Sequence, residues 1–96
     1  KGLNLFKNIS QVMLYNDLSN SHSIIEVNGK NRPGLLYKLT NEIKSLGLQI
    51  QSASVSTYGD KVVDVFYVKD IFGMKIESKT REEVIIRSLK EILLEC

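Results

Sequence analysis

The feature that most constrains the fold is a change of hydrophobic period at residues 29–35. Before Gly29 the apolar residues alternate as in a β-strand, and from Leu35 they recur every three or four positions as in a helix. Pro33, the only proline, lies between the two patterns beside Gly34. Proline suits the first turn of a helix, because the amide that it lacks would have no partner there. The sequence therefore predicts a strand that turns abruptly into a helix.

The same succession of patterns occurs twice along the chain. Strands are predicted at residues 12–17 and 23–29, a helix at 33–46, strands at 48–58 and 61–69, and a helix from residue 80. This order favours an α+β, ferredoxin-like sandwich, with a four-stranded antiparallel sheet and two helices on one face. The usual order of that fold ends with a strand after the second helix, which is missing here. We expect residues 12–17 to fill that position in a permuted arrangement, unless a partner chain fills it.

Three local patterns refine this prediction. The strand at 48–58 changes its apolar parity, so a bulge near residues 51–54 would turn both halves toward the core. Thr80 and Glu83 have the spacing of a capping box, with Thr80 as the helix cap. Asp64 interrupts an otherwise apolar strand without a second acid on its face, so we expect it at an exposed or interface position on the sheet.

Length and composition limit the function. Ninety-six residues predict a single domain, which we assign to residues 12–96 with a linker over 1–11. A net charge of +2 is small for a nucleic-acid binder, and no apolar run approaches the ~20 residues that span a bilayer. Cys96, the single cysteine, has no internal partner and fits a reduced, cytoplasmic setting. Neither zinc-ligand spacing nor a phosphate-loop motif is present, so we expect neither a metal nor a cofactor.

The joint at residues 29–35 is the best candidate for a binding site. It joins the carboxyl end of a strand to the amino end of a helix, where free amides and the helix dipole favour negative charge. Gly34 leaves the backbone uncovered, and Asn31 offers both a hydrogen-bond donor and an acceptor. Such a site suits a carboxylate or a small zwitterion. The alternative is that Asn31 only caps the helix and that Pro33 and Gly34 only make the turn.

Three segments within residues 12–94 carry a family resemblance: NRPGLL, STYGDKVVDVFYVKDIFGMKI and the preceding LYNDLSNSHSIIEVNG. They closely resemble the ACT domain family, and in particular the C-terminal ACT domain of bifunctional PII uridylyltransferase/uridylyl-removing enzymes. The resemblance implies a regulatory module without catalytic groups of its own, which senses an amino acid. In this enzyme family the effector is glutamine, the signal of sufficient nitrogen. The nucleotidyltransferase, hydrolase and further ACT domains would lie upstream in a longer chain, as the missing initial methionine also suggests.

The resemblance also implies site residues. By position, the amides of Gly34 and Leu35 would take the ligand carboxylate, and Asn31 would orient it. Such loops are often paired with the start of the strand after the first helix in a neighbouring domain, here Gln49, Ile50 and Gln51. The glutamines could equally form only the solvated side of a strand. Binding between two ACT units would change how they dock.

Functions of other classes stay open. A structural module would pair its sheet with another copy to form a homodimer, and it would need no ligand. An RNA-binding domain needs several aromatic side chains on one open sheet face, whereas Phe66 and Tyr67 are adjacent and point to opposite faces. A small hydrolase of this fold would need Arg32 and Asn31 at a phosphate loop, but Pro33 removes an amide donor there.

Overall fold

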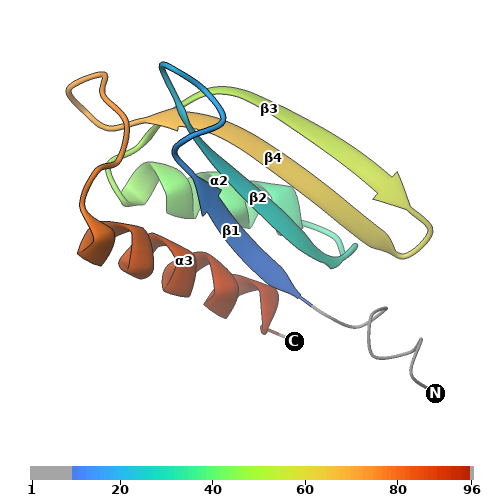
Figure 1. Ribbon diagram of the computed structural model, residues 1–96. Coiled ribbons are helices and arrows are strands. Elements are labelled where there is room, and N and C mark those ends of the chain that lie inside the picture. Colours follow the sequence, from blue (N-terminus) through green and yellow to red (C-terminus); the bar gives the residue numbers. More distant parts are fainter. Residues whose placement is uncertain (1–9, 96) are drawn as a thin grey trace.

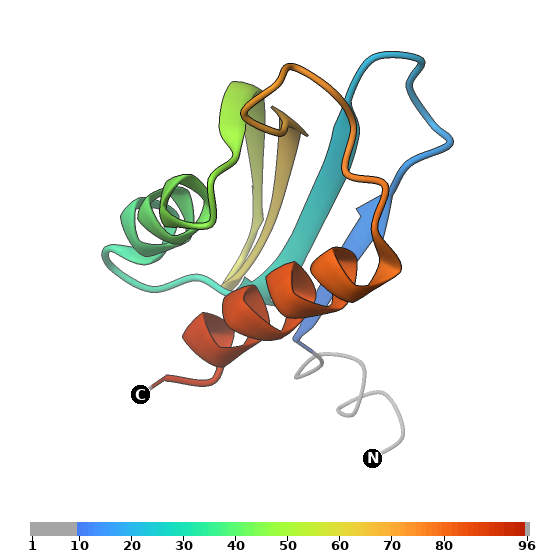
Figure 2. The same ribbon diagram turned by 90° about the vertical axis from the view of Figure 1, so that its left-hand side faces the viewer.

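The computed structural model describes residues 10–95, so Cys96 and most of the predicted linker lie outside the described residues. The elements are β1 (Gln11–Tyr15), β2 (Ser23–Lys30), α2 (Leu35–Ser45), β3 (Gln49–Tyr58), β4 (Lys61–Lys69) and α3 (Lys79–Leu93). They follow the predicted order. The strands form one antiparallel sheet in the order β1-β2-β4-β3, and both helices lie on the same face of it (Figures 1 and 2). The ferredoxin-like sandwich is confirmed.

β1 occupies the sheet position that a strand after the second helix would otherwise fill. It pairs antiparallel with β2, with Val12 opposite Val27 and Leu14 opposite Ile25. Val12, Ile25 and Val27 are all buried, so β1 helps to close the core. The permuted arrangement is therefore confirmed, and the chain completes its sheet without a partner. The strand begins and ends slightly earlier than predicted, at Gln11 and Tyr15.

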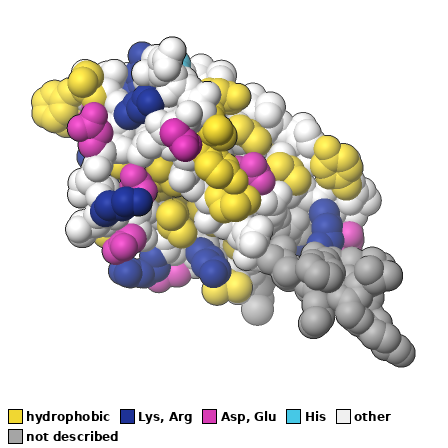
Figure 3. Space-filling model, viewed as in Figure 1, with side chains coloured by type: hydrophobic (Ala, Val, Ile, Leu, Met, Phe, Trp, Pro, Cys, Tyr) yellow, Lys and Arg dark blue, Asp and Glu magenta, His cyan; other side chains and the backbone are white. Residues whose placement is uncertain are grey.

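The core lies between the sheet and the two helices. Alternate residues of β4 face the helices, and Phe66 and Val68 are 1% and 0% exposed. The helices contribute one apolar face each, chiefly Leu35, Leu39 and Ile43 from α2 and Ile85, Leu89, Ile92 and Leu93 from α3. Within residues 10–95, no helix covers the opposite face of the sheet. Figure 3 shows hydrophobic side chains on that face and a separate group over the loop that follows β4.

β3 is an edge strand and is less buried than the sequence predicts. Its register with β4 shifts between Ile50 and Ser52, which leaves Gln51 as the extra residue of a bulge and confirms that part of the prediction. The bulge does not bring the second half of the strand into the core. Val55 lies on the helix side, opposite Asp64, yet it is 49% exposed. The reason is that the second half of β3 extends beyond α2 (Figure 1).

The second helix begins with a different cap from the predicted one. The Ser78 hydroxyl accepts a hydrogen bond from the Arg81 amide at 3.2 Å, which makes Ser78 the N-cap. Thr80 lies inside α3, so the capping box with Glu83 is wrong. Neither helix in the described chain is long and apolar enough to cross a bilayer.

Candidate ligand-binding site

The loop between β2 and α2 holds the candidate site. The backbone amide of Asn31 donates a hydrogen bond to the backbone carbonyl of Asp60 at 2.7 Å, which ties the loop to the β3–β4 hairpin. Gly34 is the N-cap of α2 and has a φ of +79°, a left-handed conformation that glycine adopts without steric cost. Pro33 therefore precedes the cap and lies outside the first helical turn.

The amino end of α2 has no capping side chain. Within the described chain, the amides of Gly34, Leu36 and Tyr37 have no hydrogen-bond partner, and that of Leu35 makes a long bond of 3.3 Å to the Arg32 carbonyl. Unpaired amides at a helix start carry partial positive charge and suit an anion. Because Gly34 is the N-cap and no side chain caps the helix, the part of the alternative in which Asn31 caps it is wrong. Whether Pro33 and Gly34 only make the turn stays open. Of the two amides expected to bind a carboxylate, the Gly34 amide is unpaired within the described chain, and the Leu35 amide makes only the long bond to Arg32.

The first turn of α2 and the strands β3 and β4 line a pocket of about 150 Å³. Its residues are Asn31, Arg32, Gly34, Leu35, Leu36, Tyr37, Val55, Val62 and Asp64. All three predicted loop residues are among them. A cavity of roughly this volume holds a molecule the size of benzene, so it can take the main-chain atoms of an amino acid. Leu36, next to the buried Leu35, is 44% exposed at this pocket.

Asp64 brings a carboxylate to the same pocket. Its side chain is 1% exposed, and its Oδ1 atom has no hydrogen-bond partner in the part of the chain that the structure describes. Burial raises the pKa of Asp64, because the charged form loses its hydration. The exposed position expected on the sheet is wrong. The missed signal is parity, since Asp64 alternates with buried Phe66 and Val68 on one face of β4.

Arg32 lines the pocket, but its guanidinium group is held by the carboxyl end of α3. It donates to the carbonyls of Ile92, Leu93 at 3.4 Å and Glu95 at 2.6 Å. Carbonyls at a helix end lack partners within the helix, so Arg32 caps α3 and ties the loop to it. This engagement argues against a hydrolase in which Arg32 would bind phosphate.

The structure does not bring the second predicted group, residues 49–51, to this pocket. Gln49 pairs with Lys69, at the opposite end of the sheet from Asn31, and its side chain donates to the Asp70 carbonyl at 2.8 Å. The family pattern places this group against the loop of a neighbouring domain. Its part in a site between two domains therefore stays a prediction.

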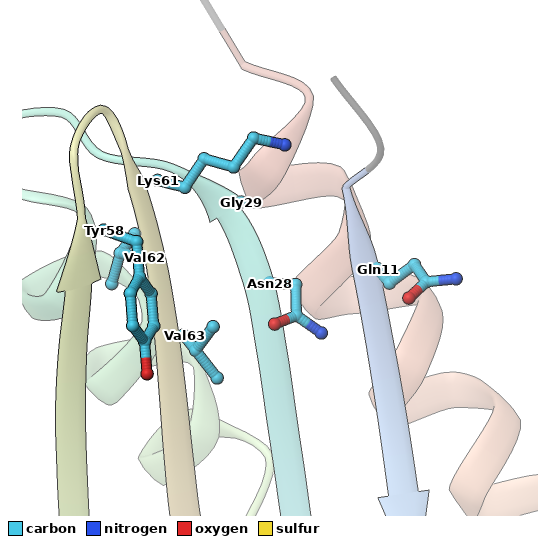
Figure 4. A pocket seen from close by; sticks show the side chains of 7 residues that line it. All are labelled: Gln11, Asn28, Gly29, Tyr58, Lys61, Val62 and Val63. Carbon is cyan, nitrogen blue, oxygen red and sulfur yellow. The ribbon is translucent and has the colours of Figure 1, made fainter. Parts of the chain in front are cut away.

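A larger pocket, of about 540 Å³, lies by the β3–β4 hairpin and is lined by all four strands (Figure 4). Its residues are Gln11, Asn28, Gly29, Tyr58, Lys61, Val62 and Val63. It has neither a buried carboxylate nor a helix start, so its size alone does not make it the better site for an amino acid. No group of three His, Cys, Asp or Glu side chains converges as a metal site in the described residues.

Comparison with known proteins identifies relatives of this chain. The family model described as the ACR family N-terminal ACT domain matches residues 18–94. Bifunctional uridylyltransferase/uridylyl-removing enzymes are 54% identical over 71 residues in Azospirillum brasilense, 48% over 84 in Gluconobacter oxydans and 41% over 90 in Cereibacter sphaeroides. These matches cover 74%, 88% and 94% of this chain. The chain spans only 8 to 10% of the length of these relatives.

The family match runs from the loop before β2 to the end of α3, so it includes the whole candidate pocket and omits β1. The model's description places its domain at an N-terminus, whereas the resemblance pointed to a C-terminal one. The place of this domain in a longer chain therefore stays a prediction. The resemblance itself is confirmed: the chain belongs to the ACT domain family.

Proposed function

We propose that this chain is the amino-acid-sensing domain of a uridylyltransferase/uridylyl-removing enzyme, with glutamine as its effector. The observation that carries this proposal is the start of α2, where amides without a capping side chain open into a pocket large enough for an amino acid's main-chain atoms. The names of the relatives supply the enzyme class. Glutamine itself comes from the family resemblance.

The pocket offers different partners to the two ends of such a ligand. The unpaired amides of Gly34 and Leu36 suit its carboxylate. Asn31 is exposed at the pocket and can pair with a side-chain carboxamide through both its oxygen and its nitrogen. Tyr37 and Val55 are 71% and 49% exposed, so they leave one side of the pocket open to a neighbouring domain.

Two contacts connect the loop and the first turns of α2 to the end of α3. Arg32 binds the last carbonyls of that helix, and Lys38 forms an ion pair with Glu95 at 3.2 Å. A ligand that reorders the loop therefore changes the support of α3 and the surface offered to the next domain. In the whole enzyme this change would shift activity from attaching UMP to PII toward removing it. The coupling is reciprocal, so docking of the neighbour would also tighten ligand binding.

Thermal unfolding of this chain with each common amino acid at millimolar concentration tests the proposal. A ligand that binds only the folded state raises the free energy of unfolding by about 2.7 kcal/mol at a hundred times its Kd. We expect L-glutamine to raise Tm and Asn31→Ala to reduce the shift. Asn41→Ala, a control that replaces an exposed asparagine in α2, should preserve it. No shift with any amino acid, in this chain or in one that includes the neighbouring ACT domain, would contradict the proposal.

An assembly domain without a ligand is the second candidate. It is favoured by the hydrophobic side chains on the open sheet face (Figure 3) and by the exposed edge strand β3. It predicts a dimer by sedimentation whether or not an amino acid is present. The RNA-binding alternative is less favoured, because Phe66 is buried in the core and only Tyr67 of this pair lies on the open face.

A further inference from the structure

We propose that Asp64 binds the ammonium group of the effector, so that the pocket selects zwitterionic amino acids over carboxylic acids that lack an amino group. The inference rests on the proposed function and deepens it. It adds a residue from β4 to a site that the sequence assigned to the β2–α2 loop. It also identifies the ammonium group as the feature by which the pocket distinguishes a ligand from a related compound that does not bind.

The first argument is that nothing in the described chain pairs with the Asp64 carboxylate where it lies. Its neighbours across the sheet are Val27 on β2 and Val55 on β3, which offer no side-chain donor. Its Oδ1 atom is buried and without a hydrogen bond within the described residues. Arg32, the one cation among the described residues that line the pocket, donates instead to carbonyls at the end of α3. A buried polar group without a partner is costly, so a cation that enters the cavity would gain by pairing with this carboxylate.

The second argument is that the pocket brings both required polarities within one small volume. The amides of Gly34 and Leu36 lie at the start of α2, and Asp64 lines the same space of about 150 Å³. In an α-amino acid the carboxylate and the ammonium are attached to one carbon, so a single small molecule satisfies both. Charge-assisted hydrogen bonds to each end are stronger than neutral ones, and burial strengthens them further.

The same arrangement disfavours a ligand without an amino group. Such a ligand leaves Asp64 buried and unpaired, or brings a second negative charge near it. Sites built to bind a polar hydrogen discriminate strongly against analogues that lack it, because the protein group is left without a partner. A neighbouring protein's lysine is the other cation that could enter from the open side, and the test below distinguishes it from a free amino acid.

The test is isothermal titration calorimetry of this chain with L-glutamine and with 4-carbamoylbutanoate, which is glutamine without its amino group. We expect wild type to bind glutamine about tenfold or more tightly than the analogue. Asp64→Asn should weaken glutamine binding about tenfold or more and change binding of the analogue less than about threefold. Asp17→Asn removes an exposed carboxylate from the β1–β2 loop and should leave both affinities unchanged.

A second readout in wild type does not depend on the folding of any variant. The ¹³C shift of the Asp64 carboxyl carbon should move on titration with glutamine and stay in place with the analogue. If wild type binds glutamine but Asp64→Asn binds it equally well, or if both ligands lose affinity equally, this inference is overturned while the proposed function stands. If wild type binds no free amino acid, either alone or in a chain that includes the neighbouring ACT domain, the proposed function fails and this inference fails with it. That result is the one expected if a lysine of a neighbouring protein occupies the pocket.

Discussion

At the scale of single residues, the Asp64 carboxylate lowers the stability of the fold, and we propose that it is kept because it binds the ligand. A buried carboxylate without a hydrogen bond costs the folded state roughly 1–3 kcal/mol. A natural sequence keeps such a cost at positions that serve function. The residue therefore marks the pocket more clearly than the loop does, since comparable loops occur in many proteins that bind nothing there.

The stability of the chain should depend on the charge of Asp64. Its folded-state pKa is raised above the ordinary value of 3.8, so the folded chain holds this proton more tightly than the unfolded chain. The resulting stability is fully present below about pH 3.8 and is lost as the pH rises through the raised pKa. We expect Asp64→Asn to be more stable than wild type by about 1 kcal/mol at pH 7, with a difference that shrinks toward pH 4.

Urea unfolding of both chains from pH 4 to pH 7 measures this difference. Contributions from Arg32 and Tyr37, the other ionisable side chains lining the pocket, cancel because both chains contain them. A difference in stability that is independent of pH would contradict this account of Asp64.

The stability of the fold should require glycine at position 34 because of the backbone conformation there. Lack of space for a side chain is not the reason. An added Cβ would meet nothing within 4 Å, but the φ of +79° is unfavourable for other residues. We expect Gly34→Ala to lower the free energy of unfolding by about 1 kcal/mol and Gly34→Asn by less, because asparagine tolerates this conformation. Thermal unfolding measures both changes. Equal stability of Gly34→Ala and wild type would mean that the turn is not left-handed in solution.

At the scale of elements, Arg32 links the loop of the pocket to the end of α3. Replacing Arg32 with methionine keeps most of the aliphatic part of the side chain but removes its hydrogen bonds to the carbonyls of Ile92, Leu93 and Glu95. We expect a loss of about 1–3 kcal/mol and faster amide hydrogen exchange in the last turn of α3.

Lys38→Met is the matched control for this variant. Its ion pair with Glu95 is about half exposed on both sides, at 51% and 50%, so its loss should cost less than about 1 kcal/mol. Hydrogen exchange at the end of α3 should then stay close to wild type. The same effect from both variants would show that Arg32 has no special part in holding α3.

The arrangement of elements could be predicted from the sequence for two reasons. The spacing of apolar residues changes clearly from strand to helix, and turn-forming residues lie at the ends of the elements. The permuted strand followed from counting strands against helices. Burial in β3 could not be predicted. Val55 lies on the core side of the sheet but is half exposed, and the second half of β3 extends beyond α2 (Figure 1). The cap of α3 was also ambiguous, because Ser78 and Thr80 are both good capping residues two positions apart.

The candidate site was predicted in part, for a comparable reason. The loop residues follow one another in sequence, so Asn31, Gly34 and Leu35 could be grouped before the fold was known. Asp64 comes from a strand about thirty residues later, and it reaches the pocket only because β4 lies next to β2. Local patterns carry no information on such a contact unless the register of the sheet is known.

At the scale of the whole molecule, the pocket is open where a second ACT domain could close it. Tyr37 and Val55 are exposed there, and β3 has a free edge in the described sheet. If the ligand lies between two domains, it should favour their association. We expect sedimentation velocity of this chain to show more dimer with saturating L-glutamine than without it. A dimer fraction that is the same with and without glutamine would favour the assembly function over the sensor.

The measurement that most directly tests the central claim is a titration of the ¹⁵N-labelled chain with L-glutamine, followed by the backbone amide signals. The account predicts saturable shifts that are largest from Gly34 to Tyr37 and at Asp64, the two sides of one pocket. Shifts centred on Asn28 and Tyr58, at the larger pocket, would place the ligand elsewhere. Such a result, or the absence of any saturable shift, would contradict the claim that the start of α2 and Asp64 together bind an amino acid.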